Sequence, residues 1–424
     1  MNIASLKALQ IYDSRGFPTV ECHVNLEDGS KGVGMVPSGA STGQFEAWEL
    51  RDGDPKYLHG KSVLCAIDNI EREIASKIIG LDAMDQAGVD LVMIELDGTA
   101  NKSRLGANAI LGVSMAVANA AAKSKNLPLF EYLGNGIGNV LPLPEIQLIG
   151  GGAHAAWRTD IQDFLLIAIG AKSYAETLQM TFEVYHTAGR LLKKRGLLAG
   201  IADEGGFWPS FSSHQEIFEF VVEAIEEAGY QPGMDLAISL DVAASDLFNE
   251  DEGIYKLPLD DAEYTPDEFI DLQVDWCEKF PIISIEDPLA DVDWGAWKKY
   301  YDKLGSRIQI IGDDLFTTNV HRIEKGIQEG VANSVLIKLN QIGSVSETID
   351  AIKLTQEAGW NPVVSARSGE TEDAFISHLA VATNAGQLKV GSFARSERMV
   401  KWNEVLRIEK FLGERAIFNG GSIF

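Results

Sequence analysis

Short apolar runs, each followed by a charged residue, recur through the second half of the chain. Five of them lead to charged residues that lie 45, 27, 25 and 29 residues apart: Asp241, Glu286, Asp313, Lys338 and Arg367. Such runs between turn signals are typical of strands buried on both faces, as in a parallel sheet. Segments 321–330 and 346–359 show helical periodicity and end in glycine. The pattern predicts repeated strand–helix units and hence a β/α barrel.

The first part of the chain has a different pattern. Apolar and polar residues alternate over 5–16 and 18–39, which indicates antiparallel strands. Helical periodicity follows over 63–80 and in the alanine-rich segment 106–125. We therefore expect a smaller α+β domain over 1–133 and a barrel over 134–424, connected through the proline-containing segment 138–147.

The charged ends of the predicted strands indicate the chemistry of the barrel. Strand C-termini share one face of a β/α barrel, and active sites are built there. Asp241, Glu286 and Asp313 would supply the oxygen ligands that Mg²⁺ prefers. Lys338 and Arg367 on the same face indicate an anionic substrate.

Three further segments are candidates for the site, each with a plainer alternative. The small residues of VPSGASTG (36–43) suit a mobile lid, although an ordinary surface loop has the same composition. His154 follows three glycines and suits a second lid, or is an incidental surface histidine. Glu204 stands between an apolar run and a Gly-Gly turn, where a barrel strand would end or where a solvated acidic turn would lie.

Charge and composition exclude several classes of partner. The chain has 62 acidic and 36 basic residues, a net charge of −26, which argues against binding to nucleic acid or to an anionic membrane. Its three cysteines lack metal or redox spacing, and the N-terminus has no signal-peptide pattern. We therefore expect a reduced, cytoplasmic protein that attracts an anionic substrate only through local cations.

Together these segments resemble the enolase family over nearly the whole chain. The matching motifs occur in order: YDSRGFPTVE, VPSGASTG, GANAILGVSMA, ADEGGF, SIEDPL, GDDLFTTN, VLIKLNQIGS, SGETED, ARSER and LRIEKFLG. The resemblance implies Mg²⁺-dependent loss of water from 2-phosphoglycerate or a similar phospho-carboxylate. It also implies a homodimer or a larger even homo-oligomer.

The resemblance implies a role for each matching residue. Asp241, Glu286 and Asp313 would hold one Mg²⁺, and Ser41 would help to hold a second ion that arrives with substrate. Lys338 would remove the α-proton, while Glu204 would protonate the departing hydroxide with support from Asp163. The remaining implied contacts are with the substrate carboxylate for Lys389, with the phosphate for Arg367, Ser368 and His154, and with the substrate for Gln162.

Three positions depart from the usual family pattern. Gly150 stands for an asparagine, Asp163 for a glutamate and Ala366 for a histidine, and each change removes volume. Arg158 stands where an uncharged residue is usual. We expect a pocket enlarged for a bulkier analogue with an additional carboxylate on phosphorus, as in the carboxyphosphonoenolpyruvate synthase branch, with Arg158 contacting that carboxylate.

Two alternatives remain open from the sequence. One is an ordinary glycolytic enolase that converts 2-phosphoglycerate to phosphoenolpyruvate and tolerates the unusual residues. The other is an enolase-fold protein that binds partners without catalysis, against which the retained lysines and metal carboxylates argue.

Overall fold

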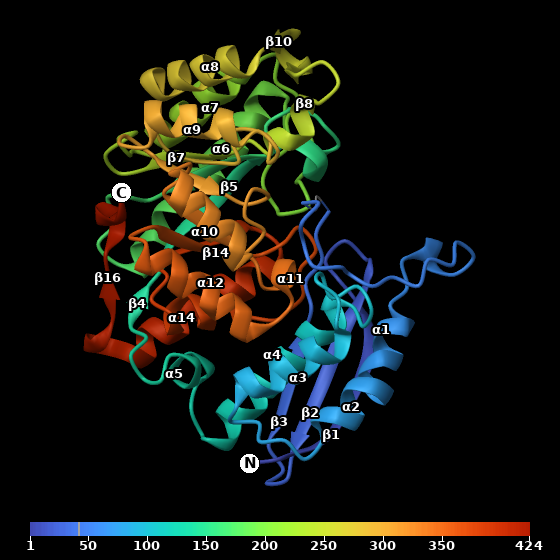
Figure 1. The fold of residues 1–424 in the computed structure, drawn as a ribbon. Coiled ribbons are helices and arrows are strands. Elements are labelled where there is room, and N and C mark those ends of the chain that lie inside the picture. The colour runs from blue at the N-terminus through green and yellow to red at the C-terminus, as the bar shows by residue number, and fades with distance from the viewer. Residues whose placement is uncertain (41–42) are drawn as a thin grey trace.

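A computed structural model describes residues 1–40 and 43–424. The N-terminal part forms a three-stranded antiparallel meander with helices on one face, to the side of a barrel built by the rest of the chain (Figure 1). The meander strands are β1 (Ile3–Tyr12), β2 (Pro18–Leu26) and β3 (Lys31–Met35). The helices beside them are α1 (Leu64–Asp68), the π-helical turn η2 (Asn69–Ile74), α2 (Ala75–Ile78), α3 (Gln86–Asp97), α4 (Ala107–Ser124) and α5 (Leu129–Leu133).

Helix α4 packs unusually closely on the meander. A Cβ atom at Gly32 would lie 1.9 Å from the carbonyl oxygen of Ala116, and one at Gly34 would lie 2.5 Å from that of Gly112. Glycine on β3 and small residues on α4 thus let the two backbones approach. The other side of the helical layer meets the barrel: the backbone N–H groups of Val345 and Ser346, at the start of α12 (Val345–Glu357), donate to Ser114 and Asp90.

The barrel closes in the order β11-β12-β13-β14-β15-β5-β6-β7. Its strands are β5 (Leu143–Gly150), β6 (Asp163–Ile167), β7 (Ala237–Asp241), β11 (Ile282–Glu286), β12 (Gln309–Gly312), β13 (Ser334–Ile337), β14 (Asn361–Ser365) and β15 (Gln387–Ser392). The covering helices, besides α12, are α6 (Tyr174–Arg195), α7 (His214–Glu227), α8 (Pro266–Lys279), α9 (Trp294–Leu304), α10 (Val320–Glu329), α11 (Leu339–Ile342), α13 (Phe375–Ala382) and α14 (Ser396–Leu412).

One strand breaks the regular alternation expected from the sequence. Strand β6 runs antiparallel to both β5 and β7. It follows β5 after the loop 151–162, which contains only the short 3₁₀ turn η3 (Gly152–Ala155), and a parallel return would need a longer crossover. Because β6 is reversed, its first residue, Asp163, pairs with the last residue of β7, Asp241, at the face where the parallel strands end.

The remaining strands form two small sheets outside the barrel. The segment 138–147, predicted as a connection, instead contains β4 (Val140–Leu141) and most of β5, and β4 pairs with β16 (Ile417–Phe418) near the C-terminus. An outlying antiparallel sheet contains β8 (Phe248–Asn249), β9 (Ile254–Leu257) and β10 (Ala262–Tyr264), with the 3₁₀ turn η5 (Pro258–Asp260) in its β9–β10 connection. No helix in the described ranges is long and apolar enough to cross a membrane.

Candidate active site

A pocket lies at the C-terminal face of the barrel. Most residues predicted to act in chemistry or metal binding line it together with polar neighbours: His154, Gln162, Asp163, Glu204, Asp241, Asp287, Asp313, Asp314, Lys338, Ser365, Ala366, Arg367, Ser368 and Lys389. Glu286 does not line the pocket but contacts Lys389, which does. They come from different barrel strands and from the loops that follow them. The charged ends seen along the sequence therefore meet in one place.

Two predicted metal ligands share Lys389 as a partner. Asp241 and Glu286 end the neighbouring strands β7 and β11, and their Cα atoms are in register. The Lys389 ammonium donates to Asp241 Oδ2 over 2.8 Å and to Glu286 Oε2 over 2.6 Å. Gln162 Nε2 also donates to Asp241 Oδ2, over 3.0 Å. Burial favours the neutral amine of Lys389, but these carboxylates raise its pKa well above the ordinary value.

The third predicted ligand, Asp313, is paired with the predicted base. Lys338 Nζ donates to Asp313 Oδ2, and Gln341 Nε2 donates to Asp313 Oδ1 over 2.8 Å. Burial lowers the pKa of Lys338, while the Asp313 carboxylate opposes this, and the net direction is upwards. The candidate base and the candidate metal ligand are thus coupled through one ion pair.

Asp287 and Asp314 bring two more carboxylates close to Asp313. Asp287 accepts the backbone N–H groups of Asp313 and Asp314 over 2.8 and 2.9 Å, one on each carboxylate oxygen. Each oxygen of Asp287 therefore holds one backbone N–H of the turn after β12. We assign Asp287 to the placement of Asp313 rather than to the ligand set.

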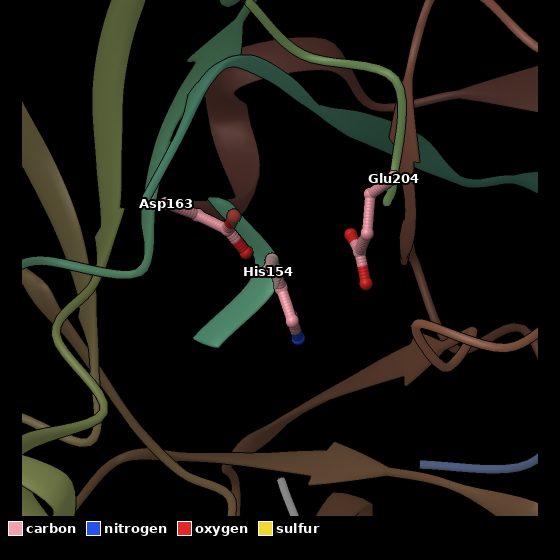
Figure 2. A group of neighbouring side chains, drawn as sticks. All are labelled: His154, Asp163 and Glu204. Carbon is pink, nitrogen blue, oxygen red and sulfur yellow. The ribbon is translucent and has the colours of Figure 1, made fainter. Parts of the chain in front are cut away.

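The predicted acid lies in a second cluster, with Asp163 and His154. Figure 2 shows the three side chains approaching one another from separate segments, and one ligand atom of each lies within 4.8 Å of the others. All three are buried, with 7% exposure for Glu204 and His154 and 1% for Asp163. The alternatives of a solvated turn at Glu204 and a surface histidine at 154 are therefore wrong. Glu204 also does not end a barrel strand; it lies in the segment between α6 and α7.

The pKa shifts in this cluster favour a different carboxyl group as the protonated one than the role of Glu204 as the acid implied. Burial raises the pKa of Asp163 well above the ordinary value, and the charge of Glu204 adds to the effect. Burial also raises the pKa of Glu204, but Arg398, His154 and two lysines reverse this and lower it. Burial lowers the pKa of His154. Before substrate binds, the carboxyl proton is thus favoured on Asp163, whereas a protonated Glu204 was expected.

The predicted phosphate side of the pocket is tied to the N-terminal domain. Arg367 forms an ion pair with Glu46, in which Nη1 lies 3.0 Å from Oε2 and Nη2 lies 3.2 Å from Oε1. Ser368 Oγ accepts the backbone N–H of Ala40 over 2.8 Å. The segment 36–40 and 43–46 therefore contacts the pocket, while Ser41, the predicted second-ion ligand, lies outside the described residues.

Two predictions about the pocket are wrong: the space at Gly150 and the position of Arg158. A Cβ at Gly150 would lie 2.6 Å from the Cβ of Ala202 and 3.2 Å from Gln147 Nε2, so glycine opens no space there. Arg158 is exposed and does not line the pocket. Its guanidinium lies 5.0 Å from the centre of the Trp208 ring and donates to Ser210 Oγ over 2.8 Å. Ala366 and Asp163 do line the pocket.

Comparisons with known proteins agree with this architecture. Residues 3–133 match the N-terminal domain of enolase, and residues 138–424 match the enolase C-terminal TIM barrel domain. The chain is also 52% identical over 423 residues to Enolase 1 of Desulfitobacterium hafniense (strain Y51), which covers 100% of this chain and 97% of that protein. The chain belongs to the enolase family. It is therefore a hydro-lyase with an α+β domain followed by a β/α barrel.

Several polar residues of this enolase-family site were not found from the sequence. Gln147, within β5, donates to Asp163 Oδ1 and accepts the backbone N–H of Gly206 over 2.7 Å, so it joins the two carboxylate segments. Glu46 lies shortly after the motif VPSGASTG, and Gln341 lies within VLIKLNQIGS but was given no role. The available signal for Gln147 was a polar residue two positions after Glu145 in a barrel strand whose other residues are apolar. The chain separation of 321 residues hid the pairing of Glu46 with Arg367.

Proposed function

We propose that this enzyme converts 2-phosphoglycerate to phosphoenolpyruvate by loss of water. The observation that carries the proposal is the pocket lined by Lys338, Lys389, Asp241, Asp313 and the Glu204–Asp163 pair, with Glu286 directly behind it on Lys389. Removal of a proton beside a carboxylate and expulsion of a hydroxide need a base, an acid and fixed positive charge. This pocket supplies a candidate for each.

The residues present fit a divalent cation. Asp241, Glu286 and Asp313 offer oxygen ligands, and Glu286 Oε1 is buried without a hydrogen-bond partner among the described residues. We propose that these three carboxylates hold Mg²⁺ and that Ser41 contributes to a second site. When bound, the ion would neutralise the carboxylates, weaken the hold of Asp313 on Lys338 and stabilise the negative charge that forms on the substrate.

Lys338 would act as the base. Its neutral amine would take the proton from C2 of the substrate, and the electron pair of the broken C–H bond would move toward the carboxylate. Lys389 would pair with that carboxylate, because its ammonium already lies among the anionic groups of the pocket. Arg367 and Ser368 would bind the phosphate, with His154 beside it.

The Glu204–Asp163 pair would complete the reaction. As the C3–O bond breaks, the departing hydroxide would take a proton from this pair and leave as water, while the electron pair at C2 forms the double bond. We propose that the proton favoured on Asp163 in the free enzyme reaches the hydroxide through Glu204. Both carboxyl groups would then be ionised, and Arg398 and His154 would stabilise the Glu204 carboxylate.

A bulkier substrate with an additional carboxylate on phosphorus is the second candidate. The small side chains of Ala366 and Asp163 in the pocket lining favour it. Gly150 and Arg158 no longer support it, because neither provides space or charge in the pocket. The full-length similarity to an enolase favours 2-phosphoglycerate.

The test is turnover of 2-phosphoglycerate by the purified protein with Mg²⁺, followed by the absorbance of the enol phosphate product. Asp313→Asn should abolish turnover and leave the circular dichroism spectrum unchanged. Failure of the wild type to form phosphoenolpyruvate would refute the proposed reaction. We further propose a homodimer or larger even assembly in the cytoplasm, which sedimentation and cell fractionation would test.

A further inference from the structure

A buried histidine outside the pocket lies between two carboxylates. His214 is the first residue of α7, is 1% exposed and packs near Trp276. Its Nδ1 lies 2.6 Å from Asp260 Oδ2, and its Nε2 lies 3.5 Å from Asp160 Oδ2. The three residues come from separate segments: α7, the turn η5 and the loop 151–162 that follows β5.

The hydrogen bonds show how these segments are joined. Asp260 accepts the backbone N–H of His214 over 3.0 Å as well as the hydrogen on Nδ1, because an ionised carboxylate can only accept. Asp160 accepts the backbone N–H of Leu259 over 2.9 Å. The end of loop 151–162 is therefore hydrogen-bonded to η5. It meets the start of α7 through the 3.5 Å contact between Asp160 Oδ2 and His214 Nε2, a nitrogen without a hydrogen-bond partner among the described residues.

This loop carries His154 and does not hold its shape alone. Gly152, Ala156 and Trp157 have φ angles of 50°, 52° and 58°, and the last two are not glycines. For residues other than glycine, this left-handed backbone conformation persists only where surrounding contacts enforce it. Close to His154, the loop is joined to the Glu204 segment by the Asp203 N–H, which donates to the carbonyl of His154 over 3.1 Å.

We propose that His214 is a positioning residue that, with Asp160 and Asp260, holds loop 151–162 so that His154 faces Glu204. His214 does not line the pocket and acts only through the loop. The inference rests on the proposed function in one respect, the role of His154 in the reaction. The attachment of the loop by His214 is independent of that role.

A double-mutant cycle separates positioning from general structural support. His214→Asn should lower kcat about tenfold, as loss of an orienting partner commonly does. In a His154→Ala background the same change should have little further effect, because the residue that His214 positions is absent. An equal loss of kcat in both backgrounds would overturn the proposal. Unchanged activity of His154→Ala alone would refute the role of His154 in the proposed function.

Limited trypsin digestion tests the attachment without activity. Arg158 is exposed within the loop, and cleavage after it should be faster in His214→Asn and in Asp160→Asn, which changes charge but barely changes shape. The control is His378→Gln, which removes another histidine–carboxylate pair, half-buried and remote from the loop in sequence, in which His378 lies 3.3 Å from Glu404. Equal cleavage rates in wild type and both loop variants, or equal acceleration in His378→Gln, would overturn the proposal.

Discussion

The Lys389 ammonium lies 2.6 Å from Glu286 Oε2, inside the barrel and away from solvent. A second carboxylate, Asp241, lies 2.8 Å from the same nitrogen. The cation proposed to bind the substrate carboxylate is therefore also the group that compensates two proposed Mg²⁺ ligands. A buried carboxylate that loses its counter-ion destabilises the folded state. Bound metal should therefore offset part of the stability that is lost when Lys389 is replaced.

This relationship predicts a metal-dependent stability defect. In the presence of a chelator, Lys389→Met should lose about 3 kcal/mol of unfolding free energy, because buried carboxylates are left uncompensated. Excess Mg²⁺ should raise the Tm of this variant more than it raises that of the wild type. Thermal unfolding followed by circular dichroism gives both values, and an equal Mg²⁺ effect on the two proteins would contradict the assigned ligand set.

The base and the acid should be separable by isotope exchange. Lys338→Ala should abolish exchange of the C2 hydrogen of 2-phosphoglycerate with deuterated solvent, since no base remains to remove it. Glu204→Gln should retain exchange but lose product formation, because the proton route to the hydroxide is interrupted. Nuclear magnetic resonance of the substrate measures exchange directly. Exchange at the wild-type rate in Lys338→Ala would show that another group is the base.

Glu145 predicts a specific pH dependence of stability. This carboxyl lies inside the barrel, where Ser239 Oγ donates to it over 2.9 Å, and burial raises its pKa from 4.5 to about 7. The folded state therefore favours the protonated form. Its stabilising contribution is complete below pH 4.5 and is lost as the pH rises toward about 7.

Glu145→Gln should remove this dependence. The difference in unfolding free energy between variant and wild type should increase by up to about 3 kcal/mol from pH 4.5 to 7 in favour of the variant. Urea unfolding at a series of pH values measures the difference and cancels the other titrating groups. A difference that does not change with pH would contradict the raised pKa.

Gly150 should not tolerate a side chain. Gly150→Ala would place a Cβ atom 2.6 Å from that of Ala202, and relief requires movement of β5 or of the Glu204 segment. We expect a loss of about 1–3 kcal/mol in unfolding free energy and reduced kcat. Ala366→Ser, a small change at a residue that lines the pocket, is the comparison variant. Wild-type stability and activity in Gly150→Ala would show that space exists at this position.

The sequence predicted the parts of the site that depend on local pattern. A charged residue at the end of a buried strand lies at the C-terminal face of a barrel. Asp241, Asp313 and Lys338 line the pocket at that face, and Glu286 ends β11 beside Asp241. The sequence did not indicate the reversed direction of β6. Asp163 therefore begins its strand and still reaches that face.

Packing volume and loop direction could not be predicted in this way. The shortened residue at 150 suggested empty space. Ala202, which is distant in sequence, and Gln147, in the same strand, already fill it. The charge of Arg158 suggested a substrate contact, but the loop turns its side chain onto Trp208. Both predictions considered one side chain alone. They left out the neighbouring residues that fill the space at position 150 and that bind Arg158.

Steady-state kcat/KM with Mg²⁺, measured for 2-phosphoglycerate and for its analogue with an additional carboxylate on phosphorus, tests the proposed function most directly. We predict efficient formation of phosphoenolpyruvate, loss of this activity with excess chelator, and weaker turnover of the analogue. Preference for the analogue would assign the chain to the second candidate reaction. Turnover of neither substrate, or undiminished turnover of 2-phosphoglycerate in excess chelator, would contradict the account.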